Sequence, residues 1–232
     1  MNVATGRLLL ALAVFPCAGF EVTTTLKNYE PLFENEQVRV GRVTLQRGES
    51  EGLHRHAYPR VLVALESGVI TVKKRDGSVE TTSYSPGMSR FQDNTDPHEP
   101  VNTGNTRFRA VVVELKKHPS VQQTSRPDPL DPLLAAAAFH AMVIDNDMVR
   151  VLEVRNRPGD FEPMHKHRRS VIIILEGGAA RFGLPDGRTR DATFSPDPQP
   201  GQPPQVFWED AETHSVLNTG NTPVRPIRVE LK

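Results

Sequence analysis

The chain has 232 residues, with 28 Lys and Arg against 28 Asp and Glu, so its formal net charge is zero. Because no general positive field and no basic run is present, we expect no nucleic acid as a partner. Apolar residues make up 37% of the chain, and 20 prolines accompany few aromatic residues. This composition is typical of a β-rich protein with many turns and with apolar side chains for two modest cores.

The N-terminus has the layout of a secretory signal. Arg7 is followed by the apolar run Leu8–Phe15 and by small residues around Cys17, and the run is too short to cross a bilayer. We expect residues 1–20 to be a signal peptide, a secreted or periplasmic location, and no membrane association beyond this segment. An unstructured leader and lipid attachment at Cys17 are the alternatives. Since Cys17 is the only cysteine, a processed chain would build any metal site from histidine and oxygen ligands.

Two halves of the chain repeat one another in the same order. The matching segments are Asn35–Val40 with Asn146–Val151, Leu53–His56 with Met164–His167, Asp76-Gly77 with Asp186-Gly187, Ser85-Pro86 with Ser195-Pro196, and Asn102–Thr106 with Asn218–Thr222. Both copies end in Val-Glu-Leu-Lys, and a Pro-rich insertion near residues 197–202 lengthens the second copy. We therefore expect two domains of one fold, residues 21–117 and 136–232, joined by a Pro-rich linker over residues 118–135.

Each copy has the pattern of short strands. Val61–Leu65 and Val171–Leu175 are continuous apolar runs rich in β-branched residues. Val69–Lys73 followed by Asp76-Gly77 predicts a hairpin with a tight primed turn. Between the copies, Leu133–His140 is Ala-rich and is compatible with one or two helical turns or with a lead-in strand. Repeated short strands separated by turns favour a barrel or a sandwich.

Six of the eight histidines fall at equivalent places in the two copies. They are His54, His56 and His98 in the first copy, and His165, His167 and His214 in the second. Residues i and i+2 of a strand share a face, so each His-x-His pair can point into a barrel, and a third imidazole about forty residues later can complete a ligand set. The alternative is a solvated strand face. His118 and His140 lie outside this pattern.

The spacing around these histidines resembles a known family. Gly48 and Gly159 each precede a His-x-His pair by six positions, and His98 and His214 are each followed four residues later by asparagine. These features resemble the two conserved motifs of the cupin superfamily, over nearly all the chain after the leader. The resemblance implies an all-β fold of two tandem cupin barrels (double-stranded β-helix, or jelly-roll), that is, a bicupin with a divalent metal site of three histidines in each barrel.

The chain also departs from the family pattern. Many cupins have a Glu ligand four or five residues after the second histidine, whereas this chain has Arg60 and Val61 in the first copy and Ser170 and Val171 in the second. Both sites therefore resemble those of the three-His diketone-cleaving, gentisate and thiol dioxygenases. That likeness makes Fe(II) the first expectation, with Zn, Mn, Ni and Cu as alternatives. In the second copy the leading glycine of the second motif is displaced to Gly201, so we expect the first site to be the better preserved.

Several other side chains are candidates for roles around the metal. Arg60 is a candidate contact for a substrate carboxylate, and the alternative is a surface arginine at a strand edge. Acidic pairs that recur in the two copies are candidates for orienting the imidazoles, the alternative being solvated loop charge. These pairs are Glu51 with Glu162, Asp93 with Glu209, and Asp96 with Glu212. Phe91 aligns with Phe207, and Trp208 then has no aromatic counterpart.

Two functions fit this pattern. The first is an enzyme, a non-haem Fe(II) dioxygenase-like protein acting on a small, chelating, oxygen-rich substrate, since three neutral ligands leave the charge of the metal uncompensated. The second is a secreted bicupin that binds a metal or a small ligand without turnover. Both imply a small-molecule partner. A homo-oligomer stays open, because the two barrels of one chain can also bury against each other.

Overall fold

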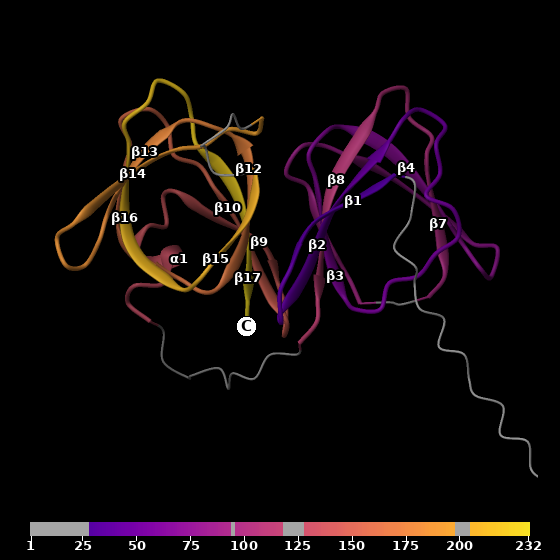
Figure 1. Cartoon of the computed structure of the whole chain (residues 1–232), viewed down its shortest axis with the longest axis horizontal. Helices are drawn as coiled ribbons and strands as arrows, with labels where there is room; N and C mark the ends of the chain where they lie inside the picture. Colours follow the sequence, from indigo (N-terminus) through magenta and orange to yellow (C-terminus); the bar gives the residue numbers. More distant parts are fainter. Residues whose placement is uncertain (1–27, 94–95, 118–127, 198–204) are drawn as a thin grey trace, which may run out of the picture.

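The computed structural model describes residues 28–93, 96–117, 128–197 and 205–232. The expected signal peptide, residues 118–127 of the expected linker, and residues 198–202 of the Pro-rich insertion lie outside these residues. Figure 1 shows the two copies as two β-barrels side by side. The all-β architecture of two tandem barrels is therefore confirmed.

The strands of the first barrel are β1 (Tyr29–Glu34), β2 (Val38–Leu45), β3 (Arg60–Ala64), β4 (Gly68–Lys74), β5 (Val79–Tyr84), β6 (Ser89–Gln92), β7 (His98–Asn102) and β8 (Phe108–Leu115). They form one sheet in the order β1-β2-β8-β3-β6 and a second in the order β5-β4-β7. All strand pairs in both sheets are antiparallel, as a jelly-roll requires.

The second barrel has a short helix, α1 (Pro132–Ala135), and the strands β9 (His140–Asp145), β10 (Val149–Val154), β11 (Phe161–His167), β12 (Ser170–Glu176), β13 (Ala179–Gly183), β14 (Thr189–Thr193), β15 (Val206–Glu209), β16 (Glu212–Asn218) and β17 (Arg225–Leu231). Its sheets have the orders β15-β12-β17-β10-β9 and β11-β16-β13-β14. The register repeats that of the first barrel, because Tyr29 pairs with Val43 and His140 pairs with Val154. Tyr29 and His140 therefore occupy equivalent positions.

The central strands are buried on both faces, which explains their continuous apolar runs. On β8, Val111 and Val113 belong to a core that contains residues of both barrels, whereas Ala110 and Val112 belong to the core inside the first barrel. Glu114 lies on the same face of β8 as Ala110 and Val112, since alternate residues of a strand share a face, and it therefore points into the first barrel. The same alternation on β17 places Glu230 on the inner face of the second barrel.

The two barrels pack against each other through their five-stranded sheets. The shared core contains Val38 and Val40 of β2 together with Val149 and Val151 of β10, all fully buried. Polar contacts accompany this packing, because Arg225 donates a hydrogen bond to the carbonyl oxygen of Pro86 at 3.2 Å. Burial of a valine side chain contributes about 1.5 kcal/mol or more, so this interface is a substantial part of the fold.

Two local expectations resolve differently. The Ala-rich stretch contains both alternatives, because α1 is one helical turn and β9 begins at His140. The hairpin between β4 and β5 is confirmed, but the primed turn is wrong. Gly77 has φ of 84°, and no non-glycine residue in the described part of the chain has a positive φ. A primed turn of type I′ needs two consecutive residues with positive φ. A type I turn followed by one left-handed glycine needs only Gly77.

Among the residues that the structure describes, no helix has the length and hydrophobicity of a membrane span.

Candidate metal centres

The same backbone geometry precedes each His-x-His segment in the two copies. Gly48 and Gly159 have φ of 78° and 81°, a conformation that favours glycine. Their backbone N–H groups donate to the carbonyl oxygens of Asn102 and Asn218, at 2.8 and 3.1 Å. The glycine and the asparagine of the two motifs therefore clamp the His-x-His segment against the strand that carries the third histidine.

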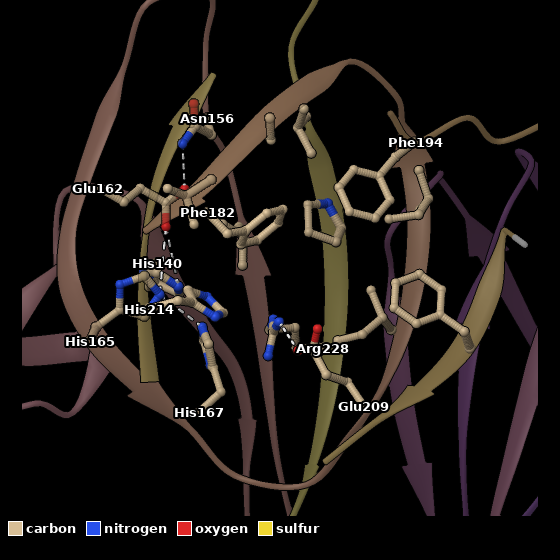
Figure 2. A pocket seen from close by; sticks show the side chains of 18 residues that line it. His140, Asn156, Glu162, His165, His167, Phe182, Phe194, Glu209, His214 and Arg228 are labelled. Atoms are coloured by element: carbon tan, nitrogen blue, oxygen red, sulfur yellow. Dashed lines mark hydrogen bonds and ion pairs between the residues drawn. The ribbon is translucent and has the colours of Figure 1, made fainter. Parts of the chain in front are cut away.

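In the second barrel this clamp brings the three expected histidines together. His165 lies opposite His214 in the register of β11 and β16, and His167 follows on the same face as His165. All three residues are buried, with at most 1% exposed. Ring centroids are 4.8 Å apart for His165 and His167, and 4.9 Å for His165 and His214. Figure 2 shows the rings gathered at one side of the cavity.

Each of these histidines has an outer nitrogen, Nδ1, that donates a hydrogen bond to an acceptor, and an inner nitrogen, Nε2. His165 Nδ1 donates to the carbonyl oxygen of Pro163 at 2.7 Å, His167 Nδ1 to Glu230 Oε1 at 2.6 Å, and His214 Nδ1 to Glu212 Oε2 at 2.9 Å. A carbonyl oxygen can only accept, so in the neutral ring of His165 the proton is on Nδ1 and the lone pair is on Nε2.

The inner nitrogens of His165 and His167 are 3.0 Å apart. Burial lowers the pKa of His165 to about 3 and lowers that of His167 well below its usual value. Both rings are therefore neutral at neutral pH and carry no second proton. Two lone pairs that face each other at this distance suit a divalent cation between them. The donor set therefore fits a metal that accepts imidazole nitrogen, such as Fe, Mn, Zn, Ni or Cu.

A fourth histidine, His140, joins this cluster, although its place outside the repeated motifs gave no sign of it. It is the first residue of β9, is 6% exposed, and its ring centroid is 4.9 Å from that of His165. The ligand atoms of His140, His165 and His167 all lie within 4.8 Å of one another. The register of the two copies could have drawn attention to it, since an offset of 111 aligns His140 with Tyr29.

In the first barrel, the ligand atoms of His54, His56 and His98 also lie within 4.8 Å of one another. Their outer nitrogens are held in the same way. His54 Nδ1 donates to the carbonyl oxygen of Gly52 at 3.0 Å, and His98 Nδ1 to that of Asp96 at 2.9 Å. Burial lowers the pKa of both rings to about 4. The six expected histidines thus lie in two clusters, one in each barrel.

Arg60 makes the first cluster different from the second. It is 2% exposed, so the alternative of a surface arginine at a strand edge is wrong. Its Nη2 lies 3.3 Å from His98 Nε2, where the guanidinium can only donate. Burial lowers the pKa of Arg60 to about 10, against the opposing effects of Glu114 and Glu51, which leaves it charged at neutral pH. This cation competes with a metal for the lone pair of His98. The second site, and not the first, is the better arranged for metal.

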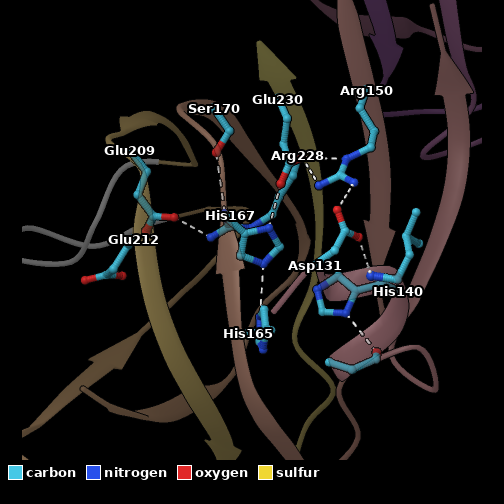
Figure 3. A network of polar contacts seen from close by, with 12 residues as sticks. Asp131, His140, Arg150, His165, His167, Ser170, Glu209, Glu212, Arg228 and Glu230 are labelled. Atoms are coloured by element: carbon cyan, nitrogen blue, oxygen red, sulfur yellow. Dashed lines mark hydrogen bonds and ion pairs between the residues drawn. The ribbon is translucent and has the colours of Figure 1, made fainter. Parts of the chain in front are cut away.

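The second barrel also has a buried arginine, but it comes from another strand. Ser170 occupies the position of Arg60, since both lie opposite the glutamate of the last strand. Arg228 of β17 fills the space instead and forms a short ion pair with Glu209. Its Nη1 lies 3.5 Å from Ser170 Oγ. Figure 3 shows Arg228 between Ser170 and Glu209, close to His167.

Glu114 and Glu230 are the carboxylates that the sequence interpretation missed. Glu114 accepts from His56 Nδ1 at 2.8 Å, as Glu230 does from His167. Glu230 is fully buried and also pairs with Arg150 Nη2 at 2.7 Å, and Arg150 in turn contacts Asp131 (Figure 3). The repeated Val-Glu-Leu-Lys ending was the available signal, because a glutamate in a strand buried on both faces cannot reach solvent and needs a buried partner.

The expected acidic pairs have different outcomes. Only Glu212 orients an imidazole through its carboxylate, whereas Asp96 does so through its backbone carbonyl oxygen. Glu209 pairs with Arg228 instead. In the strand register Glu209 corresponds to Gln92 and not to Asp93.

The aromatic pairing of the two copies is also shifted by one residue. Trp208 lies opposite Val171 as Phe91 lies opposite Val61, so Trp208 does have an aromatic counterpart. The sequence alignment was wrong here because the insertion before β15 left the exact position of the gap open. Phe207 instead lines the interior of the second barrel.

Glu162 reaches the inner side of the second cluster because of a β-bulge. The register of β11 shifts between Glu162 and His165, which turns both side chains to the interior although they are three residues apart. Glu162 Oε2 is 3.7 Å from His165 Nε2, and Oε1 accepts from Asn156 at 2.6 Å. Burial raises the pKa of Glu162 to about 7, so this carboxyl can hold a proton near neutrality. Glu51 has the equivalent sequence position, and burial raises its pKa to about 7 as well.

Each cluster borders a small interior cavity of about 50 Å³. The cavity of the second barrel is walled by the apolar side chains Ile172, Phe182, Phe194 and Phe207. Its polar lining consists of Arg228, Asn156, Glu162, Glu209 and the four histidines. About 10–15 Å³ suffices for one water centre, so this space holds a metal ion with a few waters or a very small ligand.

Two antiparallel jelly-roll barrels, each with inward-facing histidines, define a class of protein, and comparison with known proteins agrees. Residues 41–114 match the family of the cupin domain. The first barrel is therefore a cupin domain, and the chain as a whole has the fold of a bicupin. No curated protein sequence matches the chain.

Solved structures share this two-barrel fold. AerE from Microcystis aeruginosa is 11% identical, with a TM-score of 0.59, and the match covers 88% of this chain and 97% of AerE. Oxalate decarboxylase from Bacillus subtilis is 13% identical, with a TM-score of 0.56 and coverage of 84% and 68%. A mutant of salicylate 1,2-dioxygenase from Pseudoaminobacter salicylatoxidans is 13% identical, with a TM-score of 0.54 and coverage of 90% and 78%. At these identities the similarity is one of fold.

Proposed function

We propose that this chain is a metal-dependent enzyme that binds a divalent transition metal among its buried histidines and acts on a small, chelating oxyanion by dioxygenase-like chemistry. One observation carries the proposal. The outer nitrogens of His165, His167 and His214 are all held by acceptors, so their inner nitrogens are left for a metal. A bound metal would supply Lewis acidity and, as Fe(II), redox chemistry.

The metal is Fe(II) in this proposal, and Mn, Zn, Ni and Cu fit the same donors. A study of the Bacillus subtilis oxalate decarboxylase concerns its Mn(II) centres, which supports a redox-capable divalent ion for this two-barrel fold. Imidazole nitrogen suits these metals better than it suits Mg or Ca, which prefer oxygen.

The cavity and its charges support the substrate class. Three neutral imidazoles leave the charge of the metal uncompensated, and Arg228 adds a buried cation to the same cavity. Guanidinium can hold a carboxylate with two parallel hydrogen bonds once its contact with Glu209 is exchanged. The names of two neighbours, oxalate decarboxylase and salicylate dioxygenase, refer to small carboxylates. A volume of about 50 Å³ favours the smaller of such compounds.

Glu162 and Arg228 divide the remaining tasks. Arg228 orients the anion at the side of the cavity that faces Ser170. Glu162 lies beside the histidines and holds or releases a proton near neutral pH, as a general acid or base must. In the first barrel, Arg60 would have the role that Arg228 has in the second, and would contact and orient a substrate carboxylate. Apolar side chains line much of both cavities.

A binding function without turnover is the second candidate, and one observation favours it. Each cavity holds only about 50 Å³, and the histidines of the second barrel are at most 6% exposed. A structural or stored metal needs no larger space. With the signal peptide predicted over residues 1–20, both the enzyme and the binding protein are proposed to be exported.

Metal content and turnover together test this proposal. We expect two equivalents of divalent metal in the wild type, and one in each of the variants His56→Ala and His167→Ala, by elemental analysis. Oxygen uptake is then measured with small two- to four-carbon acids and diketones. Turnover lost in His167→Ala supports the enzyme, whereas tight metal binding with no turnover on any of them supports the binding protein. A wild type that binds no divalent metal contradicts both.

A further inference from the structure

His140 is held in place as firmly as the three motif histidines. It follows α1, whose first turn is capped by Asp131, and its backbone pairs with Val154. Its Nδ1 donates to the carbonyl oxygen of Ala136 at 3.0 Å, which puts the proton of the neutral ring on that nitrogen. The orientation of the ring is therefore fixed, and Nε2 carries the lone pair.

This Nε2 atom is buried and has no hydrogen-bond partner among the described residues. Glu162 Oε2 lies 3.9 Å away, too far for a hydrogen bond. A buried polar atom without a partner costs about 1–3 kcal/mol, so such atoms are rare and need a reason. The ring lies 4.9 Å from that of His165 and 5.2 Å from that of His167, between centroids, and faces the same cavity (Figure 2).

We propose that His140 is a fourth imidazole ligand of the metal in the second barrel, an inference that rests on the proposed metal function. This chain lacks the Glu ligand that many cupins have, and His140, the first residue of the lead-in strand β9, adds an imidazole to the cluster from another direction. Its ligand nitrogen lies within 4.8 Å of those of His165 and His167. His214 lies beside these three, with its ring centroid 4.9 Å from that of His165, so the cluster would offer four imidazoles to one metal.

The first barrel has no equivalent ligand. Tyr29 occupies the register position of His140, and its ring lies over Gly41, where a side chain would clash with it. Burial raises the pKa of Tyr29 to about 12, so its hydroxyl stays protonated and is a poor ligand. The two barrels therefore hold inequivalent centres, one with three histidines beside Arg60 and one with four histidines beside Glu162.

The test isolates the second centre in a His56→Ala background, which removes the first. His140→Phe keeps a ring of similar size and removes both nitrogens, and His140→Gln keeps a donor for the carbonyl oxygen of Ala136. Zn(II) affinity is measured by competition with a chelator, and Cu(II) is used as a probe whose electron paramagnetic resonance reports the number of bound nitrogens. The matched control is Tyr29→Phe in a His167→Ala background, which removes only a hydroxyl at the equivalent position.

We expect both His140 variants to lose more than about 100-fold in Zn(II) affinity, beyond the 10–100-fold loss typical of a residue that only orients a ligand. The Cu(II) spectrum should show one nitrogen fewer, the metal-free variants should melt no lower than their background, and the Tyr29→Phe control should keep its affinity. Unchanged affinity and spectrum in the variants would overturn the role of His140 alone. If the His56→Ala background binds neither Zn(II) nor Cu(II), both the proposed function and the role of His140 are wrong.

Discussion

Glu230→Gln tests how much an outer carboxylate contributes to the centre of the second barrel. Glu230 is fully buried and accepts from His167 Nδ1 at 2.6 Å. The substitution keeps the shape of the side chain and removes its charge. A charge-assisted hydrogen bond is about twice as strong as a neutral one, and its loss makes the imidazole a weaker base.

The expected loss of metal affinity is about 10–100-fold, which corresponds to about 1.4–2.8 kcal/mol. The fold itself should be affected less, because Arg150 keeps a second carboxylate, Asp131, at 2.5 Å. Chelator competition measures the affinity in a His56→Ala background, and thermal unfolding of the metal-free protein measures the cost to stability.

The matched control is Glu114→Gln, which removes the corresponding carboxylate from His56 in the first barrel. Each substitution should weaken the centre of its own barrel and leave the other unchanged. Full metal affinity in Glu230→Gln, with the protein folded, would refute the reasoning that this carboxylate acts through His167.

Three further predictions follow from the geometry. Arg60→Gln should raise the metal affinity of the first barrel about tenfold or more, because it removes the guanidinium from His98 Nε2. Chelator competition measures this affinity, and an unchanged value would contradict the prediction. Asn102→Ala should lower the free energy of unfolding by about 3 kcal/mol, measured by urea denaturation, because its buried amide donates to two carbonyl oxygens and accepts one N–H. In metal-free protein, burial raises the pKa of Glu162 from 4.5 to about 7, so its contribution to stability is full below pH 4.5 and is lost as the pH rises through about 7. The free energy of unfolding of Glu162→Gln, relative to that of the wild type, should therefore rise by up to about 3 kcal/mol between pH 4.5 and about 7. A difference in unfolding free energy that does not change with pH would contradict this prediction.

The sequence predicted the architecture well because the fold is built twice. Ordered matches such as Asn102–Thr106 with Asn218–Thr222 predicted two copies, and their alternating and continuous apolar runs predicted barrel strands. The His-x-His pairs predicted inward-facing rings because strand alternation is local. The structure brings all six motif histidines into two clusters as this reasoning expected.

What the sequence could not supply depends on contacts between strands far apart along the chain. His140 reaches the second cluster only because β9 pairs with β10 in a particular register. Glu162 turns inward only because of a bulge. Arg228 replaces Arg60 from a different strand, a swap that no alignment of the two copies reveals, since each arginine aligns with an uncharged residue.

The location of bound metal tests the central claim most directly. Crystals grown with a divalent transition metal and measured at its absorption edge should show anomalous density inside the second barrel. We expect that density about 2.0–2.2 Å from the Nε2 atoms of the buried histidines, with Nδ1 of His167 still on Glu230. A metal found only at the surface, or no anomalous density inside either barrel, would contradict the account.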